Sequence, residues 1–566
     1  MMRSTLFLGI AALVLVGCGG GDINLSPTTS VSNSNNSTSN NNNSGNNANA
    51  VCASYTNSGG QTISGTFDAG TGNCTYSPSF ADAGNNITVD LNIPSLANDG
   101  AHIFEGSLFI GEDFDNDADL AAAGITEGGD GPTLTIEAGA TLAWQTNANF
   151  LIINRGSQIF AVGRADAPIT FTSVSDINGT AAFDAVQLWG GVVINGFGVT
   201  NACSYTGTEA GGDLATTECH VPAEGAAGLD ESNYGGSNND DGSGRLEYVR
   251  VKHTGATVGN GDELNGISFG GVGRDTIVRN LQVYSTFDDG IEMFGGAFDI
   301  ENFVALYARD DSIDIDEGWE GTITNALVIQ NATDGNHCIE ADGIASFSGL
   351  SAPDVETRIT QGINSDVVIN NLTCIISANG AATATHDPGA GFRFREGLFI
   401  DVNDSVIIGS TSANDTTSAN DNYCLRIDNR SQTAAQDGDL NLSGVLISCA
   451  EPFRGQTFPN GTDTEATFFA AEGNTAVATT ADGVAVDPTA TADTALQVLE
   501  GAPAIFSIDA ATQTIPDAMG MGVATGITPT GGAFIGGLSL GAMDWTDGWV
   551  FGLRDDMGNS NPNLWF

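Results

Sequence analysis

Two acidic groups recur at a fixed interval near the middle of the chain. The segment DDGIE begins at Asp288 and the segment DDSID begins at Asp310, so that 22 residues separate the two first aspartates. Carboxylates gathered in this way supply oxygen ligands for Ca2+, which takes roughly six to eight of them. Two carboxylates about 5 Å apart are also what a retaining glycoside hydrolase requires. The repeat therefore predicts either a calcium site or a pair of catalytic acids.

The calcium hypothesis covers two regions of the chain. An earlier loop, EDFDNDADL, places aspartates at alternate positions, as calcium loops of the D-x-D-x-D kind do. Ala118 stands where an EF-hand loop requires glycine, and the last position of such a loop holds no glutamate here. The expected calcium ligands are Asp289, Asp311, Asp314 and Asp316 in the repeat and Asp113, Asp115 and Asp117 in the earlier loop. In both regions, aspartates that are simply hydrated at turns are the alternative.

The elements that position the repeated acids are short β-rich segments. RNLQVYS from Arg279, ENFVALY from Glu301 and TNALVIQ from Thr324 carry asparagines spaced by 22 and 23 residues. Each is accompanied by a second short strand, and the series of second strands is GIEMF, SIDID, CIEAD, GFRFR and CLRID. A period near 22 residues without helical periodicity is typical of the coils of a parallel β-helix. The sequence therefore predicts an all-β solenoid.

Alternation within the second strands assigns their side chains to two faces. The residues expected to point inward are Ile291, Ile313, Ile339, Phe392 and Leu425. One outward column is expected to hold Glu292, Asp314, Glu340, Arg393 and Arg426, and a second Phe294, Asp316, Asp342, Arg395 and Asp428. Carboxylates stacked at about 5 Å repel each other by about 3 kcal/mol at an effective dielectric constant of about 20. A cation, the neighbouring arginines or a protonated acid must relieve that repulsion.

Three longer segments extend this pattern and carry a family resemblance. They are LNGISFGGVGRDTIVRNLQVYSTFDDGIEMFGG, DDSIDIDEGWEG and the C-terminal DWTDGWVFGL. With them the chain resembles a family of largely uncharacterised bacterial surface or secreted lipoproteins with a right-handed parallel β-helix of the pectate-lyase-like fold. The resemblance covers roughly residues 90 to 566. It implies the fold and an exported location and supplies no activity.

Because the broader fold class includes pectate lyases and polygalacturonase-like hydrolases, a carbohydrate-active enzyme is the alternative to a binding protein. Such an enzyme would be a glycoside hydrolase or a polysaccharide lyase, and it would use the stacked acids. A lyase would also need calcium to bind the substrate carboxylates and a basic side chain to remove a proton. Its expected catalytic residues are Asp289, Asp311, Glu292, Asp314 and Arg393. The G-H-G and R-I-K motifs of polygalacturonase-like hydrolases are matched only imperfectly, by GNH and RID. The sequence therefore favours a binding protein over an enzyme.

The N-terminus predicts a lipid anchor. Arg3 precedes an apolar run from Leu6 to Val16, which is too short to cross a bilayer and is typical of a signal peptide. The following LVGC resembles the lipobox of bacterial lipoproteins, which implies that Cys18 becomes the lipidated N-terminus. In that family an aspartate after the cysteine favours the inner membrane, and Gly19 stands there instead. The expected location is the outer membrane, with the protein exposed on the cell surface.

Cysteine content and charge support an exported protein. The eight other cysteines fall in sequence-near pairs and allow up to four disulfides, whose connectivity the sequence leaves open: Cys52 and Cys74, Cys203 and Cys219, Cys338 and Cys374, Cys424 and Cys449. The formal net charge is -53, from 69 acidic and 16 basic residues. Such a surface repels nucleic acid, so no nucleic-acid partner is expected. It suits a salty or calcium-rich exterior.

These observations predict four regions along the chain. Residues 1–17 are a lipoprotein signal peptide, and residues 18–50 carry the lipidated cysteine and a disordered Ser/Asn tether. Residues 51–450 form the disulfide-bonded β-helix, and residues 451–566 form a C-terminal extension with a β-rich cap that closes the open end of the coils. The function predicted is calcium-supported binding or adhesion at the cell surface, with a polysaccharide or an outer-membrane protein as partner.

Overall fold

The structure is a computed structural model. It describes residues 52–82, 84–223, 232–257, 263–331, 334–377, 389–409, 423–449, 451–455, 457–476 and short stretches between 479 and 553. The predicted signal peptide, the tether and Cys18 lie outside the described residues. Within the described ranges, none of the helices combines the length and the apolar character that crossing a membrane requires.

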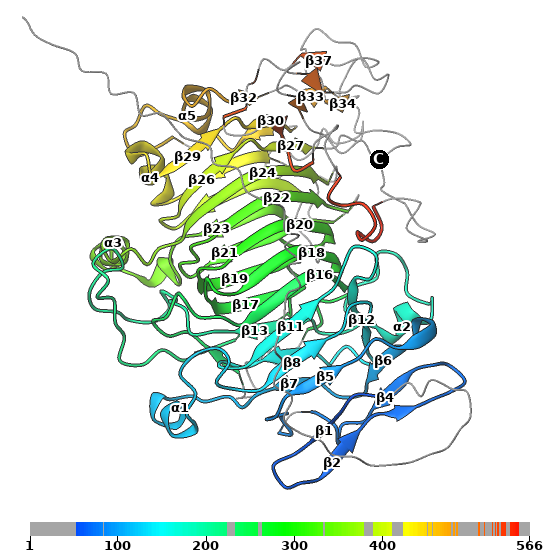
Figure 1. Cartoon of the computed structure of the whole chain (residues 1–566). Helices are drawn as coiled ribbons and strands as arrows, with labels where there is room; N and C mark the ends of the chain where they lie inside the picture. The colour runs from blue at the N-terminus through cyan, green and yellow to red at the C-terminus, as the bar shows by residue number, and fades with distance from the viewer. Residues whose placement is uncertain are drawn as a thin grey trace, which may run out of the picture. The chain divides into compact units, whose positions relative to one another are not determined.

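Two large sheets, wound by the chain coil after coil, form the body of the protein (Figure 1). All the pairings in the ten-stranded sheet are parallel. Its strands, in spatial order, are β7 (Leu108–Ile110), β10 (Leu151–Ile153), β13 (Val192–Asn195), β17 (Ile267–Val272), β19 (Ile291–Gly296), β21 (Ile313–Asp316), β23 (His337–Asp342), β25 (Ala390–Arg395), β28 (Tyr423–Ile427) and β31 (Glu451–Phe453). This arrangement confirms the predicted parallel β-helix.

The second sheet has 18 strands, all paired in parallel except β3 with β4. They are β3 (Thr66–Phe67), β4 (Cys74–Tyr76), β5 (Leu91–Ile93), β6 (Ala101–Phe104), β8 (Thr133–Ile136), β9 (Thr141–Trp144), β11 (Gln158–Val162), β12 (Ile169–Ser173), β16 (Gly244–Lys252), β18 (Ile277–Thr286), β20 (Asp299–Ala308), β22 (Thr322–Ile329), β24 (Asp366–Ile376), β26 (Phe399–Asn403), β27 (Val406–Gly409), β29 (Leu440–Ser443), β30 (Leu446–Ser448) and β32 (Thr475–Ala476).

Short elements lie outside these two sheets. The helices are α1 (Asp117–Ala123), α2 (Val174–Ile177), α3 (Ala352–Gln361), α4 (Ser431–Asp437) and α5 (Glu465–Ala471), with 3-10 turns at Ala97–Asp99 and Phe347–Gly349. The two-stranded pairs are β1 (Ser54–Thr56) with β2 (Thr62–Ser64), β14 (Val221–Pro222) with β15 (Asn233–Tyr234), β33 (Thr479–Thr480) with β34 (Gly483–Val484), β35 (Ile508–Asp509) with β38 (Phe534–Ile535), and β36 (Thr514–Ile515) with β37 (Val523–Ala524).

The periodic asparagines bend the long strands of the second sheet. Asn280, Asn302 and Asn325 have φ values of 52°, 64° and 61°, a left-handed conformation that asparagine adopts more readily than most residues. Asn302 Nδ2 donates to Asn280 Oδ1 at 3.1 Å, and Asn325 Nδ2 donates to Asn302 Oδ1 at 3.0 Å. The asparagines thus stack along one corner of successive coils, which explains why they recur with the period of the coil.

The space between the sheets is an apolar core that follows the stack of coils. Ile291 pairs with Ile313, and Ile339 pairs with Phe392, which pairs with Leu425. All five side chains are almost fully buried, as alternation predicts. Four disulfides join the sequence-near cysteines: Cys52 to Cys74, Cys203 to Cys219, Cys338 to Cys374 and Cys424 to Cys449. The prediction that disulfides form is confirmed, and the structure settles their connectivity.

The described C-terminal residues cover the side of the coils. Gly537 N donates to Thr373 Oγ1 in β24 at 2.8 Å, whereas Phe551 N donates to Gln282 Oε1 in β18 at 2.7 Å. The segment therefore crosses several coils. Its apolar residues pack on outward positions of the long strands, in a cluster, called here the lateral cluster, that includes Tyr284, Val304, Leu306, Leu327, Ile329, Ile375, Ile535, Leu538, Trp549, Val550 and Leu553. This position differs from the open end of the stack that the sequence analysis assigned to the segment.

A short helix lies at the end of the coils instead. Helix α5 lies between β31 and β32 along the chain, at the end of the stack where β32 lies (Figure 1). Its Phe468 and Phe469 belong to the core cluster, and Phe469 meets Phe453 edge to face with ring centroids 5.4 Å apart. Glu465 at its start accepts hydrogen bonds from Ile427 N at 3.1 Å and from Gly455 N at 2.7 Å. The helix thus shields apolar side chains and strand ends of the final coils.

Candidate cation site on the ten-stranded sheet

Polar side chains form the two predicted columns on the outer face of the ten-stranded sheet. In the first column Glu292 pairs with Asp314, Asp314 with Glu340, Glu340 with Arg393, and Arg393 with Arg426. In the second column, Phe294 pairs with Asp316, and Asp342 pairs with Arg395. The first column therefore passes from acidic to basic residues as the coils advance, whereas the second column holds Arg395 between the acids Asp342 and Asp428.

A third column lies at the turn that precedes each strand. Asp289 N donates to Asn265 Oδ1 at 3.2 Å, Asp311 N to Asp289 Oδ1 at 2.9 Å, and His337 N to Asp311 Oδ1 at 2.6 Å. Asn265, Asp289, Asp311 and His337 thus hold neighbouring coils together through side-chain to backbone bonds. Their sequence spacing is 24, 22 and 26 residues. The two aspartates have a structural role that stands whether or not a cation binds.

The columns and the turns beside them bring carboxylates together in two groups that consist of oxygen ligands only. One group is Asp289, Glu292 and Asp314, and the other is Asp288, Asp289 and Asp310. Within each group, one carboxylate oxygen per residue lies within 4.8 Å of the others. Asp289 and Glu292 are each 7% exposed. Asn265 Nδ2 donates to Glu292 Oε2 at 2.6 Å, which orients this carboxylate within the group.

Burial makes these carboxylates costly to ionise. It raises the pKa of Asp289 well above its usual range, and the nearby charges of Asp288, Asp314 and Asp311 raise it further. Burial likewise raises the pKa of Asp314, with Asp311 and Glu340 adding to the effect. A divalent cation removes this cost because its charge favours the ionised form. The carboxylate group of Asp289, Glu292 and Asp314 therefore fits a hard cation such as Ca2+.

These raised pKa values predict how the metal-free protein responds to pH. The folded chain retains protons on Asp289 and Asp314 that the unfolded chain releases above about pH 4, so the free energy of unfolding falls as pH rises from about 4 through the folded pKa values. Urea denaturation in a chelator between pH 5 and 8 measures this slope. Asp289→Asn, which keeps the acceptor oxygen as Asn265 does, is expected to give a shallower slope, and an equal slope in both proteins would contradict the assignment.

A third group combines a histidine with two carboxylates, Asp311, His337 and Glu340. His337 Nδ1 lies 2.8 Å from Asp311 Oδ1, and its Nε2 lies 2.8 Å from the Tyr423 hydroxyl. Burial opposes a charge on His337, but Asp311 and its hydrogen bond outweigh burial and raise the pKa of the imidazole well above its usual range. Because both ring nitrogens are already bonded, this group is an ion pair rather than a metal site.

The arginines that follow in the columns are paired with the last acids. Arg395 contacts Glu340 at 2.7 Å and also Asp342, and Arg393 contacts Glu340 at 3.0 Å. Arg426 contacts Asp428 at 2.5 Å. The pairing of Arg393 and Arg395 with Glu340 and Asp342 is one of the three ways to relieve the repulsion that the sequence leaves open. The arginine side chains stay about a quarter exposed, at 24%, 27% and 25%, so each retains surface for a ligand.

The other predicted calcium ligands are placed differently. Asp316 lies in the second column beside Asp342, and burial, reinforced by that neighbour, raises its pKa well above the usual range. Asp113 accepts Asn233 N at 2.8 Å, Asp115 accepts Asn116 Nδ2 at 2.8 Å, and Asp117 contacts His220 at 3.0 Å. Among the described residues the structure does not gather the last three into one ligand group. A calcium ion in that loop stays a prediction.

The sequence predicts the first two columns and a hydrogen-bonding role for His337, but the third column and the place of Asn265 in it were missed. The signal was present, because the segments NGI, DGI, DSI and HCI place the four bonded residues two positions before an inward isoleucine. Ser268 lies in the segment GISFG, which has the spacing of a hydrolase nucleophile elbow. It sits inside strand β17 and accepts Asn265 Nδ2 at 3.0 Å, so it lacks the strand-to-helix turn that such a nucleophile needs.

Comparison with known proteins bears on the fold. Residues 115–487 match the model of a family described as pectate-lyase like beta helix domain. No curated protein and no solved structure matches the chain. The matched region contains all three columns of the candidate cation site.

Proposed function

The chain belongs to the pectate-lyase like beta helix domain family, and from that premise we propose that it is a calcium-binding protein of the bacterial cell surface that binds polysaccharide or an envelope protein. The observation that carries the proposal is the buried group of Asp289, Glu292 and Asp314. Burial makes Asp289 and Asp314 costly to ionise, so a bound cation would stabilise their charged forms, and an all-oxygen ligand set suits calcium.

An extracellular location is supported by the four disulfides, because such bonds persist in oxidising compartments. Calcium is also more abundant outside cells, where sites of this kind have modest affinity. The lipid anchor at Cys18 belongs to the proposal on sequence grounds alone, since the residue precedes the described ranges. Together these features favour an anchored outer-membrane protein that displays its β-helix on the cell surface.

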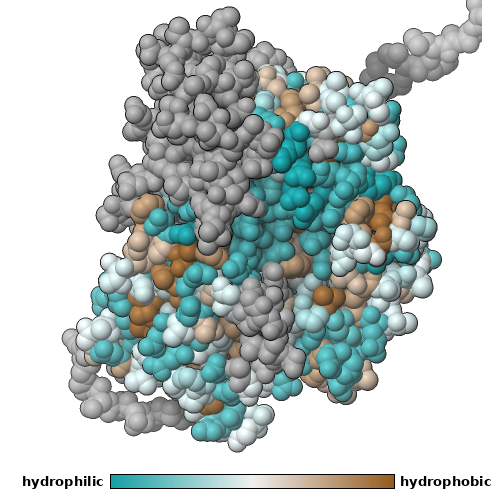
Figure 2. Space-filling model, turned by 180° about the vertical axis from the view of Figure 1, so that it is seen from behind, coloured by the Kyte–Doolittle hydropathy of each residue, from teal (hydrophilic) through white to brown (hydrophobic). Residues whose placement is uncertain are grey.

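A hydrated, extended ligand suits the polar columns. The quarter-exposed side chains of Arg393, Arg395 and Arg426 continue the columns beyond the acids, and arginine forks bind carboxylates and hydroxyl oxygens. On the side of the molecule opposite to that of Figure 1, hydrophilic residues gather in a recessed part of the described surface (Figure 2). A surface of hydrophilic residues differs from the mostly apolar centre of a permanent protein–protein interface. A polysaccharide with carboxylate groups is therefore the ligand class that these charges favour.

Calcium should stabilise the protein at pH 8. At a calcium concentration about a hundred times the Kd, the linked gain is about 2.7 kcal/mol, which thermal unfolding with and without the ion measures as a rise in Tm. Asp314→Asn should remove most of that rise, whereas Asp166→Asn, at a side chain that is 80% exposed, should leave it unchanged. A wild-type Tm that does not respond to calcium would show that the carboxylate group is not a calcium site.

Ligand binding is tested on the same proteins with a panel of acidic and neutral polysaccharides, while new reducing ends and unsaturated products are followed. Calcium-dependent retention of an acidic polysaccharide without products supports a binding protein. Product formation that Asp311→Asn combined with Asp314→Asn abolishes, in a protein that stays folded, supports an enzyme instead.

A carbohydrate-active enzyme is the second candidate, and one observation favours it. Asp311 and Glu340 lie in one group, yet burial raises the pKa of Asp311, whereas His337 and Arg395 outweigh burial and lower the pKa of Glu340. Two neighbouring carboxyl groups with opposite shifts are what an acid and base pair requires. Close by, burial and Asp342 raise the pKa of Glu396 to about 7, a value suited to proton transfer near neutral pH.

A further inference from the structure

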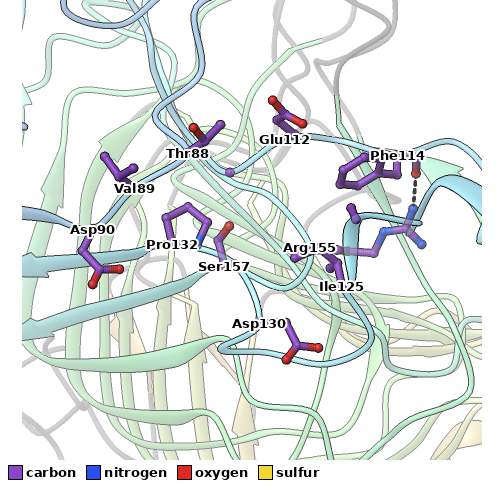
Figure 3. A pocket seen from close by; sticks show the side chains of 13 residues that line it. Thr88, Val89, Asp90, Glu112, Phe114, Ile125, Asp130, Pro132, Arg155 and Ser157 are labelled. Atoms are coloured by element: carbon purple, nitrogen blue, oxygen red, sulfur yellow. Dashed lines mark hydrogen bonds between the residues drawn. The ribbon is translucent and has the colours of Figure 1, made fainter. Parts of the chain in front are cut away.

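A cavity of about 530 Å³ lies at the corner between the two sheets in the early coils (Figure 3). Its wall comes from four separate pieces of chain: the residues before β5, the loop after β7, the loop after α1 and the turn between β10 and β11. The lining residues of the first two pieces precede the region that matches the family model. None of the lining residues belongs to the three columns described above.

The floor of the cavity holds two polar groups without hydrogen-bond partners among the described residues. They are Arg155 Nε and Ser157 Oγ, on side chains that belong to residues 3% and 1% exposed. Leaving a buried polar group unpaired is unfavourable, so such atoms point to a partner that binds from outside the chain. Glycines preserve the space around the hydroxyl, because a Cβ at Gly111 would lie 2.0 Å from Ser157 Oγ.

The guanidinium of Arg155 is held rigidly by neutral acceptors. Its terminal nitrogens donate to the carbonyl oxygens of Cys219 at 3.1 Å, Gly235 at 2.9 Å and Phe114 at 2.5 Å. A fourth contact joins Nη2 to His220 Nδ1 at 2.8 Å. These bonds fix the orientation of the whole side chain, so that Nε offers a donor in a defined direction.

The rim of the cavity has the opposite charge. Asp90, Glu112 and Asp130 are exposed and stand around it, and Phe114 and Pro132 add apolar surface (Figure 3). An anion would meet three carboxylates at this rim, and an amine would meet Arg155 below it. A neutral ligand avoids both conflicts. Its polar groups must still donate to the rim and pair with donors at the floor, and hydroxyl groups do both.

From this arrangement we propose that the cavity is a binding site for a neutral sugar residue. Its hydroxyls donate to the rim carboxylates and accept from Arg155 Nε and Ser157 Oγ, and its ring packs on Phe114 and Pro132. The volume falls in the range that small-molecule sites occupy. The site does not depend on the proposed calcium function, since the two share no residue.

Titration calorimetry on the full chain, in a detergent without a sugar headgroup, tests the proposal. The probes are glucose, galactose, mannose and N-acetylglucosamine with their β-linked disaccharides, and glucuronate and glucosamine serve as charged analogues. Saturable binding of at least one neutral sugar, tighter than that of its charged analogue, is the expected result. Absence of saturable binding by every neutral probe, or tighter binding of a charged analogue, would overturn the proposal.

Two variants, each read against a control, locate the binding and separate it from folding. Ala123→Trp places an indole at an exposed lining position of α1 and should weaken binding at least tenfold, whereas Ala122→Trp, at an exposed position beside it outside the lining, should not. Ser157→Ala should weaken binding roughly 3–10-fold with no loss of stability, because the hydroxyl has no bond to lose. Binding that Ala123→Trp leaves intact would place the sugar elsewhere.

Asp289→Asn should leave the sugar affinity unchanged, so failure of the calcium site is distinguishable from failure of this one.

Discussion

Replacing Trp549 by alanine is expected to lower the free energy of unfolding by about 3–5 kcal/mol. The side chain is fully buried in the lateral cluster, where its ring meets Tyr248 edge to face at 5.7 Å and its Nε1 donates to Trp545 O at 2.7 Å. Its carbonyl oxygen accepts a hydrogen bond from Arg250 Nε. Truncation therefore leaves a cavity and loosens the segment that covers the outward apolar residues of the long strands.

Urea denaturation followed by far-UV circular dichroism measures the loss, and binding of a hydrophobic dye reports exposure of the lateral cluster. Phe67→Ala is the matched control, because that aromatic side chain is 40% exposed and its truncation should cost less than about 1 kcal/mol. A Trp549→Ala protein as stable as the control would mean that the C-terminal segment does not stabilise the coils.

Replacing His337 by glutamine should cost about 3–5 kcal/mol at pH 7, because it removes the cation that pairs with the buried carboxylate of Glu340 and contacts Asp311. The pKa of His337 is raised in the folded chain, so its contribution is fully present below the unfolded value of about 6.5. The contribution is lost as pH rises through the folded pKa. The stability difference between wild type and variant should therefore narrow in alkaline solution.

Urea denaturation of both proteins between pH 6.5 and 10 measures this narrowing. His102→Gln is the control, because His102 is also buried and hydrogen-bonded at both ring nitrogens, to Tyr76 at 2.7 Å and to Pro94 O at 2.7 Å. Burial lowers the pKa of His102 to about 4, so this imidazole is neutral over the whole interval. Its substitution should give a pH-independent loss. A difference for His337→Gln that stays constant with pH would argue against a charged imidazole.

Much of the candidate site could be predicted because its pattern is local. Alternation within a strand decides which side chains share a face, and the recurrence of Asn280, Asn302 and Asn325 sets the coil length. Together these two regularities are sufficient to stack Glu292, Asp314 and Glu340 in one column.

The lateral cluster was harder to predict from the sequence than the candidate cation site. Its signal lay in the continuous apolar run of ENFVALY, which indicates a strand buried on both faces, but the run does not say what covers the outer face.

What the sequence by itself determined is the parallel β-helix, the identity of the stacked residues and the presence of cysteines suited to disulfides. The tertiary structure alone decided which carboxylates lie close enough to share a cation, that His337 lies between Asp311 and Glu340, and that Arg155 reaches a cavity formed by four distant pieces of chain. The physical reason is that pairing, burial and pKa depend on distances between coils of unequal length. Alternation and spacing determine only the direction of each side chain within its own coil.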